Sequence, residues 1–135
     1  MVLLDLPQVL DQIADVDHPD RMKMMPADMF QPIHLEISAA LLARVIHDWD
    51  DERALHILTN VHNALPSGGK VFLVEMIIPE DGSFGGLCDL HLQMASGGRE
   101  RTSLQYSHLL QQAGFNVLAI HALPALPSII EGVKP

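Results

Sequence analysis

The sequence has a single cysteine, few aromatic residues and fewer than half as many basic as acidic side chains. Cys88 alone excludes an internal disulfide framework and a zinc site built on cysteines, and it fits a reducing cytoplasm. The formal net charge of −9 argues against binding to nucleic acid or to an anionic membrane. No apolar run approaches the ~20 residues of a membrane span, and the start lacks the basic stretch and cleavage site of a secretion signal.

The composition is that of one folded domain. A chain of 135 residues that is 48% hydrophobic can bury a core, which excludes disorder as its main state. The eight histidines show neither an H-E-x-x-H string nor a Cys/His spacing, so the sequence predicts no metal site. No internal repeat or linker divides the chain.

Apolar runs alternate with segments of helical spacing. Strands that are covered on both faces are apolar throughout, so short runs of this kind predict parallel strands at 2–4, 22–25, 39–45 and 71–76. Apolar residues at helical spacing predict helices at 7–15, 51–65, 88–95 and 102–113. The final strands, 115–120 and 128–131, flank a turn with prolines and favour an antiparallel edge hairpin. This order predicts an α/β fold with a mostly parallel sheet.

Four polar residues lie at or just after the ends of predicted parallel strands: Asp5, Asp28, His47 and Glu75. Ligands of open α/β sheets bind outside the carboxyl ends of the strands, so these side chains are expected to share one cleft. Each has a structural alternative when taken alone. Asp5 can cap the next helix, Glu75 can be a partly exposed strand end, and His47 can be a structural histidine.

Two of these positions suit a nucleoside. Asp5 is placed to accept hydrogen bonds from both hydroxyls of a ribose. Asp28 can accept from the exocyclic amine of adenine, and the thioether of Met29 can pack on the ring. These contacts fit nicotinamide and sulfonium cofactors alike. No G-x-G-x-x-G string follows a first strand, and the glycine pairs of the sequence are interpreted as turns and caps.

Two strings are specific: H-D-W-D-D-E at 47–52 and G-G-R-E-R-T at 97–102. Weaker ones occur in a consistent order around them, and together they cover nearly the whole chain: D-L-P at 5–7, A-D-M-F at 27–30, A-L-P-S-G-G-K at 64–70, V-E at 74–75 and A-G-F at 113–115. In these strings the sequence resembles the S-adenosylmethionine-dependent small-molecule O-methyltransferases of plant phenolic and bacterial natural-product metabolism. Members of that family carry a winged-helix dimerisation domain in front of the catalytic domain.

The resemblance implies an incomplete Rossmann-like sheet of the class I methyltransferase type, mostly parallel with an antiparallel carboxy-terminal edge hairpin. Residues 1–135 would be the carboxy-terminal part of a catalytic domain. The first strand, its Gly-rich loop and the amino-terminal dimerisation domain would be absent. The full-length family form is expected to be a homodimer. This chain alone is expected to bind the cofactor poorly or not at all, and to transfer no methyl group.

The implied reaction is methyl transfer from S-adenosylmethionine to a hydroxyl of a small aromatic or natural-product acceptor. By the resemblance, His47 is the general base, and Glu75 and Glu100 orient and polarise its imidazole. A phenol with a pKa of about 10 is a poor nucleophile at neutral pH, and an imidazole with a pKa of about 6.5 can take its proton during attack.

The resemblance also implies the binding residues. Asp5 would hold the ribose of the cofactor, and Asp28, Met29 and Phe30 the adenine. The lysine that the family usually has four residues before the histidine is Ala43 here. Arg44 is the candidate replacement, although alternation along a strand would point it to the opposite face. The acceptor pocket would be lined by Asp48, His91, Gln93 and Met94.

Three alternatives remain open. The first is a non-catalytic or degenerate cofactor-binding module that associates with another chain through the sheet edge left by the missing strand. The second is a relative of the same fold with hydroxylation or decarboxylation chemistry, which the intact set of His47, Glu75 and Glu100 disfavours. The third, part of a nicotinamide-dependent dehydrogenase, explains neither of the two specific strings.

Overall fold

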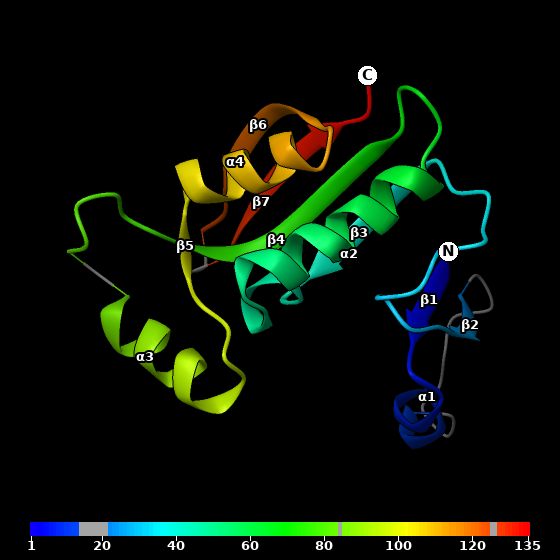
Figure 1. Cartoon of the computed structure of the whole chain (residues 1–135), viewed down its shortest axis with the longest axis horizontal. Helices are drawn as coiled ribbons and strands as arrows, with labels where there is room; N and C mark the ends of the chain where they lie inside the picture. Colours follow the sequence, from blue (N-terminus) through cyan, green and yellow to red (C-terminus); the bar gives the residue numbers. More distant parts are fainter. Residues whose placement is uncertain (14–21, 84, 125–126) are drawn as a thin grey trace.

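A computed structural model describes residues 1–13, 22–83, 85–124 and 127–135 (Figure 1). Strands and helices alternate through most of the chain, which confirms the predicted α/β class. The elements are, in order, β1 (Val2–Asp5), α1 (Pro7–Ile13), β2 (Lys23–Pro26), β3 (Ala39–Ala43), the 3₁₀ helix η1 (Ile46–Asp48), α2 (Asp51–Ala64), β4 (Lys70–Ile78), α3 (Gly86–Ala95), β5 (Arg101–Thr102), α4 (Ser103–Gln112), β6 (Asn116–Ala122) and β7 (Pro127–Val133).

The strands form two sheets. Strands β1 and β2 pair in parallel, with Leu3 opposite Met24. The larger sheet has the order β3-β4-β7-β6, and β5 pairs with the end of β4. Strand β3 is parallel to β4, whereas β7 is antiparallel to both β4 and β6. The antiparallel carboxy-terminal hairpin is therefore confirmed, and β7, its inner strand, joins it to the parallel part of the sheet.

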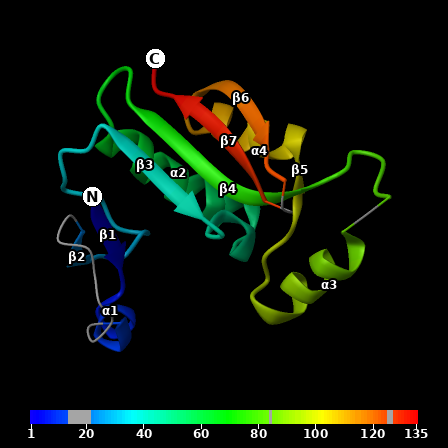
Figure 2. The same cartoon turned by 180° about the vertical axis from the view of Figure 1, so that it is seen from behind.

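The two sheets are not joined by strand pairing. Within the part of the chain that the structure describes, β1 pairs only with β2, and β3 pairs only with β4. Each of these strands therefore has a second edge that no described strand covers, and Figure 2 shows the β1–β2 pair as a separate body beside β3.

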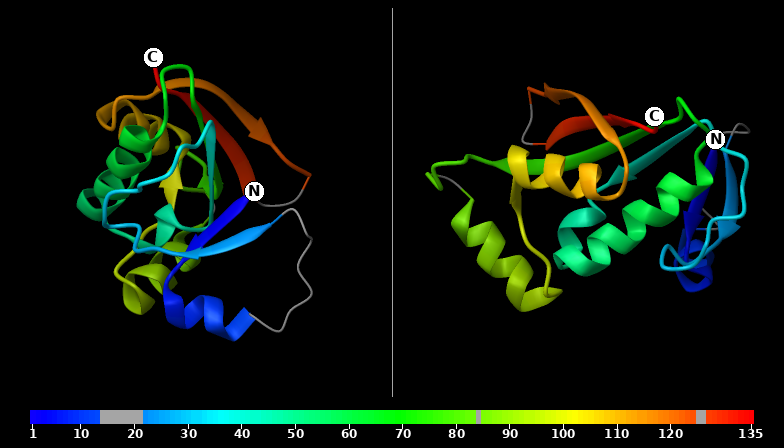
Figure 3. Two further views of the ribbon diagram at one scale, coloured as in Figure 1. Left: turned by 90° about the vertical axis from the view of Figure 1, so that its right-hand side faces the viewer. Right: turned by 45° about the horizontal axis from the view of Figure 1, so that its top comes forward.

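The core lies between the larger sheet and the helices α2 and α4, which cover one face of it (Figures 1 and 3). Alternate residues of the strands point to these helices, and they form rows such as Leu42, Leu73 and Ile130 across three strands. Burying one such side chain contributes about 1.5–3 kcal/mol. Asp50 caps the start of α2 by accepting from the Arg53 N–H at 2.9 Å, so the helix begins directly after the turn of His47.

The opposite face of the larger sheet is covered by no described helix (Figure 2). Strand alternation and register place Leu41, Phe72 and Val74 on this face, and 66% of the Leu41 surface is exposed. Parallel strands are normally buried on both faces, whereas no described helix covers this apolar face.

Several predicted boundaries are wrong in ways that affect the site. Strand β4 continues to Ile78, so Glu75 lies inside the strand and not at its end. Strand β3 ends at Ala43, and Arg44 adopts a left-handed conformation with φ of 54°. Strand alternation therefore does not determine where Arg44 points. The 3₁₀ helix η1 and the short strand β5 were not expected, because neither carries a periodic apolar pattern.

The end of the first predicted helix, at 14–15, lies outside the described residues. Among the helices of the described ranges, none combines the length and the apolar character that crossing a bilayer requires.

Candidate functional site

The site begins where the parallel pairing of β3 and β4 ends. The last pair is Ala43 with Val74, and Glu75 is the next residue of β4. Its carboxylate is fully buried, and Oε1 accepts hydrogen bonds from the backbone N–H groups of Val45 at 3.1 Å and Ile46 at 2.9 Å. A buried carboxylate of β4 therefore fixes the path of the chain as it leaves β3 and enters η1.

His47 lies in the middle of η1 and is 3% exposed. Its Nδ1 atom is 3.6 Å from Oε1 of Glu100, and its Nε2 atom is 3.5 Å from Oδ1 of Asp48. These separations are longer than ordinary hydrogen bonds, but they bring a carboxylate near each ring nitrogen. Glu100 is 4% exposed, whereas the Asp48 side chain reaches the surface. A proton on the imidazole would meet negative charge on both sides.

Four buried polar atoms of the described residues have no hydrogen-bond partner: His47 Nδ1, Glu75 Oε2, Glu100 Oε2 and Tyr106 Oη. Buried polar atoms are normally paired, and an unpaired one costs about 1–3 kcal/mol. Burial and the nearby Glu75 carboxyl raise the pKa of Tyr106, so its hydroxyl stays neutral. Unpaired atoms concentrated around one imidazole are typical of a functional centre, because packing alone would favour apolar side chains here.

The pKa of Glu75 is raised above its usual value, chiefly because burial penalises the ionised carboxyl. The neighbouring His47 and the N–H groups of Ile46 and Val45 favour the ionised form and offset this only in part. Glu100 adds repulsion between carboxylates, which acts in the same direction as burial.

Arg101 also belongs to the site, and it was missed at the level of sequence. Its guanidinium is fully buried and donates to Oδ1 of Asp51 from Nε at 3.0 Å and from Nη2 at 2.8 Å. It also donates to the carbonyl oxygens of Ile46 at 3.0 Å and Trp49 at 2.8 Å. The G-G-R-E-R-T string contains Arg101, but nothing in the letters shows which of its two arginines is buried.

The proposed nucleoside residues lie on the exits of β1 and β2. Asp5 is half-buried and accepts from the Leu6 N–H at 2.8 Å, whereas Asp28 is exposed and accepts from the Phe30 N–H at 2.9 Å. Nδ2 of Asn60 in α2 donates to the Met29 carbonyl at 3.0 Å. Helix α2 therefore anchors the turn of Asp28.

An aromatic contact connects this turn to the His47 region, since the Phe30 ring meets the Trp49 ring edge-on with centroids 4.9 Å apart. The structure thus brings together His47, Glu75 and Glu100, and it links the turn of Asp28 to them. Asp5 lies on the separate β1–β2 pair, and no hydrogen bond or ion pair among the described residues connects it to the His47 cluster. Of the four residues expected to share one cleft, His47 and Glu75 therefore lie together, the turn of Asp28 is linked to them, and Asp5 is not.

The expected acceptor residues His91, Gln93 and Met94 are exposed on α3, which lies beyond β5 and away from the sheet (Figure 1). Helix α3 is tied to the cluster through Asp89, whose Oδ1 accepts from the Glu100 N–H at 2.9 Å. Arg44 is also exposed, and its backbone N–H donates to the Val74 carbonyl at 3.0 Å.

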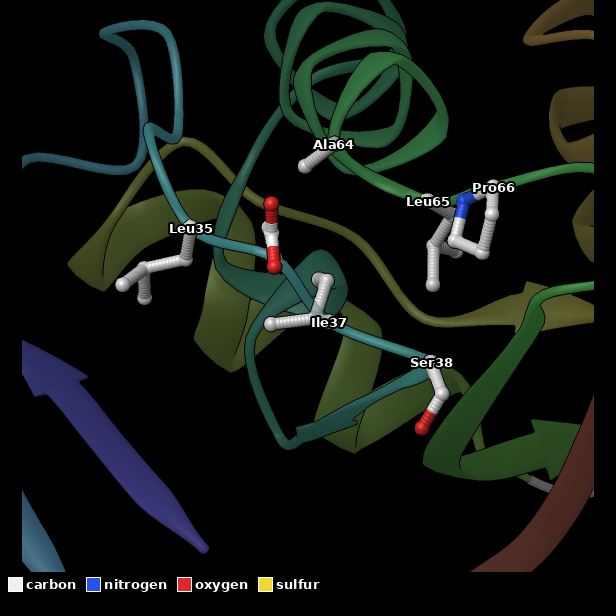
Figure 4. A pocket seen from close by; sticks show the side chains of 7 residues that line it. Leu35, Ile37, Ser38, Ala64, Leu65 and Pro66 are labelled. Atoms are coloured by element: carbon white, nitrogen blue, oxygen red, sulfur yellow. The ribbon is translucent and has the colours of Figure 1, made fainter.

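A hollow of about 560 Å³ lies elsewhere, between the segment before β3 and the end of α2 (Figure 4). It is lined by Leu35, Glu36, Ile37, Ser38, Ala64, Leu65 and Pro66. His47 precedes the start of α2, and this hollow lies at the other end of that helix, so it is not part of the histidine site.

Fold and site define an α/β domain with a buried histidine–carboxylate centre next to the ends of parallel strands. A family model for the O-methyltransferase domain matches residues 1–116. The chain belongs to this O-methyltransferase domain family.

Individual proteins support the same assignment. The chain is 31% identical over 136 residues to phenazine O-methyltransferase PhzM of Lysobacter antibioticus. The aligned region covers 96% of this chain and 40% of that protein. Human N-acetylserotonin methyltransferase, solved in complex with SAM, superposes with a TM-score of 0.93 at 26% identity, over 98% of this chain and 40% of the other. The O-methyltransferase NcsB1 of neocarzinostatin biosynthesis was solved with S-adenosyl-L-homocysteine and 1,4-dihydroxy-2-naphthoic acid. It superposes with a TM-score of 0.84 at 29% identity, and the match covers 99% of this chain and 42% of that one. The chain spans about 40% of the length of these relatives.

The raised pKa of Glu75 predicts a stability that depends on pH. Above the usual carboxyl pKa of 4.5 the folded chain retains the Glu75 proton more than the unfolded chain does, so this residue lowers stability as pH rises. Glu75→Gln keeps an acceptor for Val45 and Ile46 and removes the titration. We expect the melting temperature of the variant, relative to the native chain, to rise between pH 4.5 and 8 in thermal denaturation.

Glu80→Gln is the control with the opposite sign. The pKa of Glu80 is lowered below its usual value of 4.5, chiefly by the N–H group of Leu104, so its ionised form favours folding. This contribution is present above the usual pKa and is lost only as pH falls below it, so Glu80→Gln should be less stable than the native chain by an amount that stays constant over the same pH range. A Glu75→Gln difference that does not change with pH would contradict the assigned ionisation.

Proposed function

We propose that this chain is the carboxy-terminal part of the catalytic domain of an S-adenosylmethionine-dependent O-methyltransferase. The acceptor would be a hydroxyl of a small aromatic or natural-product molecule. The observation that carries the proposal is the buried imidazole of His47, with a carboxylate near each ring nitrogen. The membership of the family supports it, as do the solved neighbours, which hold SAM or, in NcsB1, S-adenosyl-L-homocysteine with a dihydroxynaphthoic acid.

The residues present fit the adenosine end of the cofactor. Asp28 is an exposed carboxylate on an anchored turn, next to Met29 and Phe30. We assign the adenine to these three residues, the ribose to Asp5, and a charged contact at the end of β3 to Arg44. When bound, the cofactor supplies an electrophilic methyl group on a sulfonium. The described residues contain no Gly-rich loop that would hold its methionine end.

The proposed base is His47. Glu100 faces Nδ1, which leaves Nε2 as the atom that takes the hydroxyl proton of the acceptor. As the imidazole becomes charged, the Glu100 carboxylate stabilises the N–H at Nδ1. Of the two glutamates assigned to the imidazole, Glu100 lies 3.6 Å from Nδ1, whereas Oε1 of Glu75 binds the backbone N–H groups of the turn.

We assign the acceptor side to Asp48, near Nε2, and to His91, Gln93 and Met94 on α3. The chain spans about 40% of the length of its relatives, so oligomeric state and location are proposed for the whole protein. We propose a homodimer for the full-length form and, from the single cysteine, a cytoplasmic location. For the isolated chain we propose weak cofactor binding, because no described strand joins β1 to β3.

A second candidate is a non-catalytic association module. It is favoured by the open edges of β1 and β3 and by the uncovered apolar face around Leu41. This candidate needs no base and no adenine site, and it predicts no response in either experiment below.

The cofactor assignment is tested by titrating the ¹⁵N-labelled chain with S-adenosylhomocysteine and following its amide signals by NMR. We expect shifts at Asp28, Met29 and Phe30 with a Kd of about 1 mM or weaker. Asp28→Asn should abolish them. Asp81→Asn is the matched control, because Asp81 accepts from the N–H two residues on, as Asp28 does, in another exposed loop. A Kd in the micromolar range would refute the proposal of weak cofactor binding. Amide signals of Asp28, Met29 and Phe30 that do not shift would refute the adenine site.

The base is tested in a chimera that joins this chain to the preceding segment of PhzM from Lysobacter antibioticus. We expect SAM-dependent methylation of a hydroxylated aromatic acceptor, and a loss of about 10²–10⁴-fold in kcat in His47→Gln. His108→Gln, an exposed position of α4, should keep the activity. A folded chimera that is inactive, or a His47→Gln variant as active as the control, would contradict the proposal.

A further inference from the structure

We propose that Arg101, held by Asp51, is a positioning residue that fixes the turn carrying the base, an inference that rests on the proposed role of His47. No described contact joins the Arg101 side chain to the imidazole itself. Its guanidinium instead donates to the carbonyl oxygens of Ile46, Trp49 and, at 3.4 Å, Arg99. Ile46 is the first residue of η1, and Trp49 directly follows its end.

The turn needs such support because it is short. A three-residue 3₁₀ helix satisfies few of its own backbone groups, and its two internal hydrogen bonds, at 3.3 Å each, are long. Glu75 binds the N–H groups on the entry side of the turn, at Val45 and Ile46. Arg101 binds the carbonyl of Ile46 at the start of the turn and that of Trp49 just after its end. Glu75 therefore holds only the entry, whereas Arg101 joins the two ends of the segment that holds His47.

The segment before Arg101 is fitted closely to the same turn. The Arg99 N–H donates to the His47 carbonyl at 2.9 Å. A Cβ atom at Gly98 would collide with that carbonyl and with the backbone of Asp48, so only glycine allows this approach. Glu100, which faces Nδ1 of His47, lies between Arg99 and Arg101. The contacts that fix η1 therefore also fix the distance between His47 and Glu100.

The positive charge of the Arg101 guanidinium is balanced by a carboxylate at the start of α2. Asp51 is the first residue of that helix, where the helix dipole favours an anion, and it binds both nitrogens of the Arg101 fork. The buried guanidinium has no exposed surface, while Asp51 is 56% exposed. The Tyr106 ring lies 5.9 Å from the guanidinium carbon. A lysine would keep the charge but offers no planar fork for the two carbonyls and the carboxylate.

The test is hydrogen exchange and NMR on the 135-residue chain, without cofactor. In Arg101→Lys we expect the amides of Trp49 and Arg99 to exchange at least about 10-fold faster relative to Leu110 of α4, whose exchange reports global stability. We also expect the ring signal of His47, assigned through His47→Gln, to move toward the position of exposed histidines. Asp51→Asn should give the same pattern at a smaller size, and it serves if Arg101→Lys does not fold.

Arg99→Lys is the matched control, because Arg99 donates to the same Asp51 carboxylate, at 3.2 Å, but its side chain contacts no carbonyl of the turn. It should leave the ring signal and the relative exchange unchanged. Equal acceleration at Trp49 and Leu110, an unmoved ring signal, or the same effect in Arg99→Lys would overturn the proposal. These readouts need no turnover. A failure of methyl transfer in the chimera would therefore be distinct from a failure of the positioning role proposed for Arg101.

Discussion

The site depends on one interaction: the hydrogen bonds from the backbone N–H groups of Val45 and Ile46 to the buried carboxylate of Glu75. The parallel ladder between β3 and β4 stops at Ala43 and Val74, and Arg44 then turns the chain through a left-handed conformation. Two N–H groups would be left without acceptors there. The next residue of β4 supplies one carboxylate oxygen for both, and this sets where η1 begins.

Burial of this carboxylate has an energetic cost, which the raised pKa of Glu75 reflects. The partial compensation comes from the two N–H groups and from His47, so the anchor and the imidazole are electrostatically dependent on each other. Arg101 completes the arrangement from the other side by binding the carbonyls of Ile46 and Trp49. An α/β fold needing only stability would fill this space with apolar side chains, and the polar groups are therefore best explained by the chemistry proposed for His47.

Much of the fold was predictable, because buried strands and amphipathic helices leave periodic patterns in the sequence. The strand at β4 and the helix at α2 were confirmed on that basis. The separation into two sheets was not predicted, since pairing between distant strands leaves no local pattern. Of the site, His47, Glu75 and Glu100 were recognised by resemblance and lie close together. The backbone role of Glu75 and the burial of Arg101 were missed, because both depend on contacts between segments 29 and 55 residues apart.

The hold of Glu75 on the histidine turn is tested most directly by NMR couplings across hydrogen bonds in the chain labelled with ¹⁵N and ¹³C. We expect couplings from the amide nitrogens of Val45 and Ile46 to the carboxyl carbon of Glu75, seen in the same spectrum as backbone couplings within the β3–β4 ladder. If the ladder couplings are present and both Glu75 couplings are absent, the carboxylate does not hold the histidine turn and the account is contradicted.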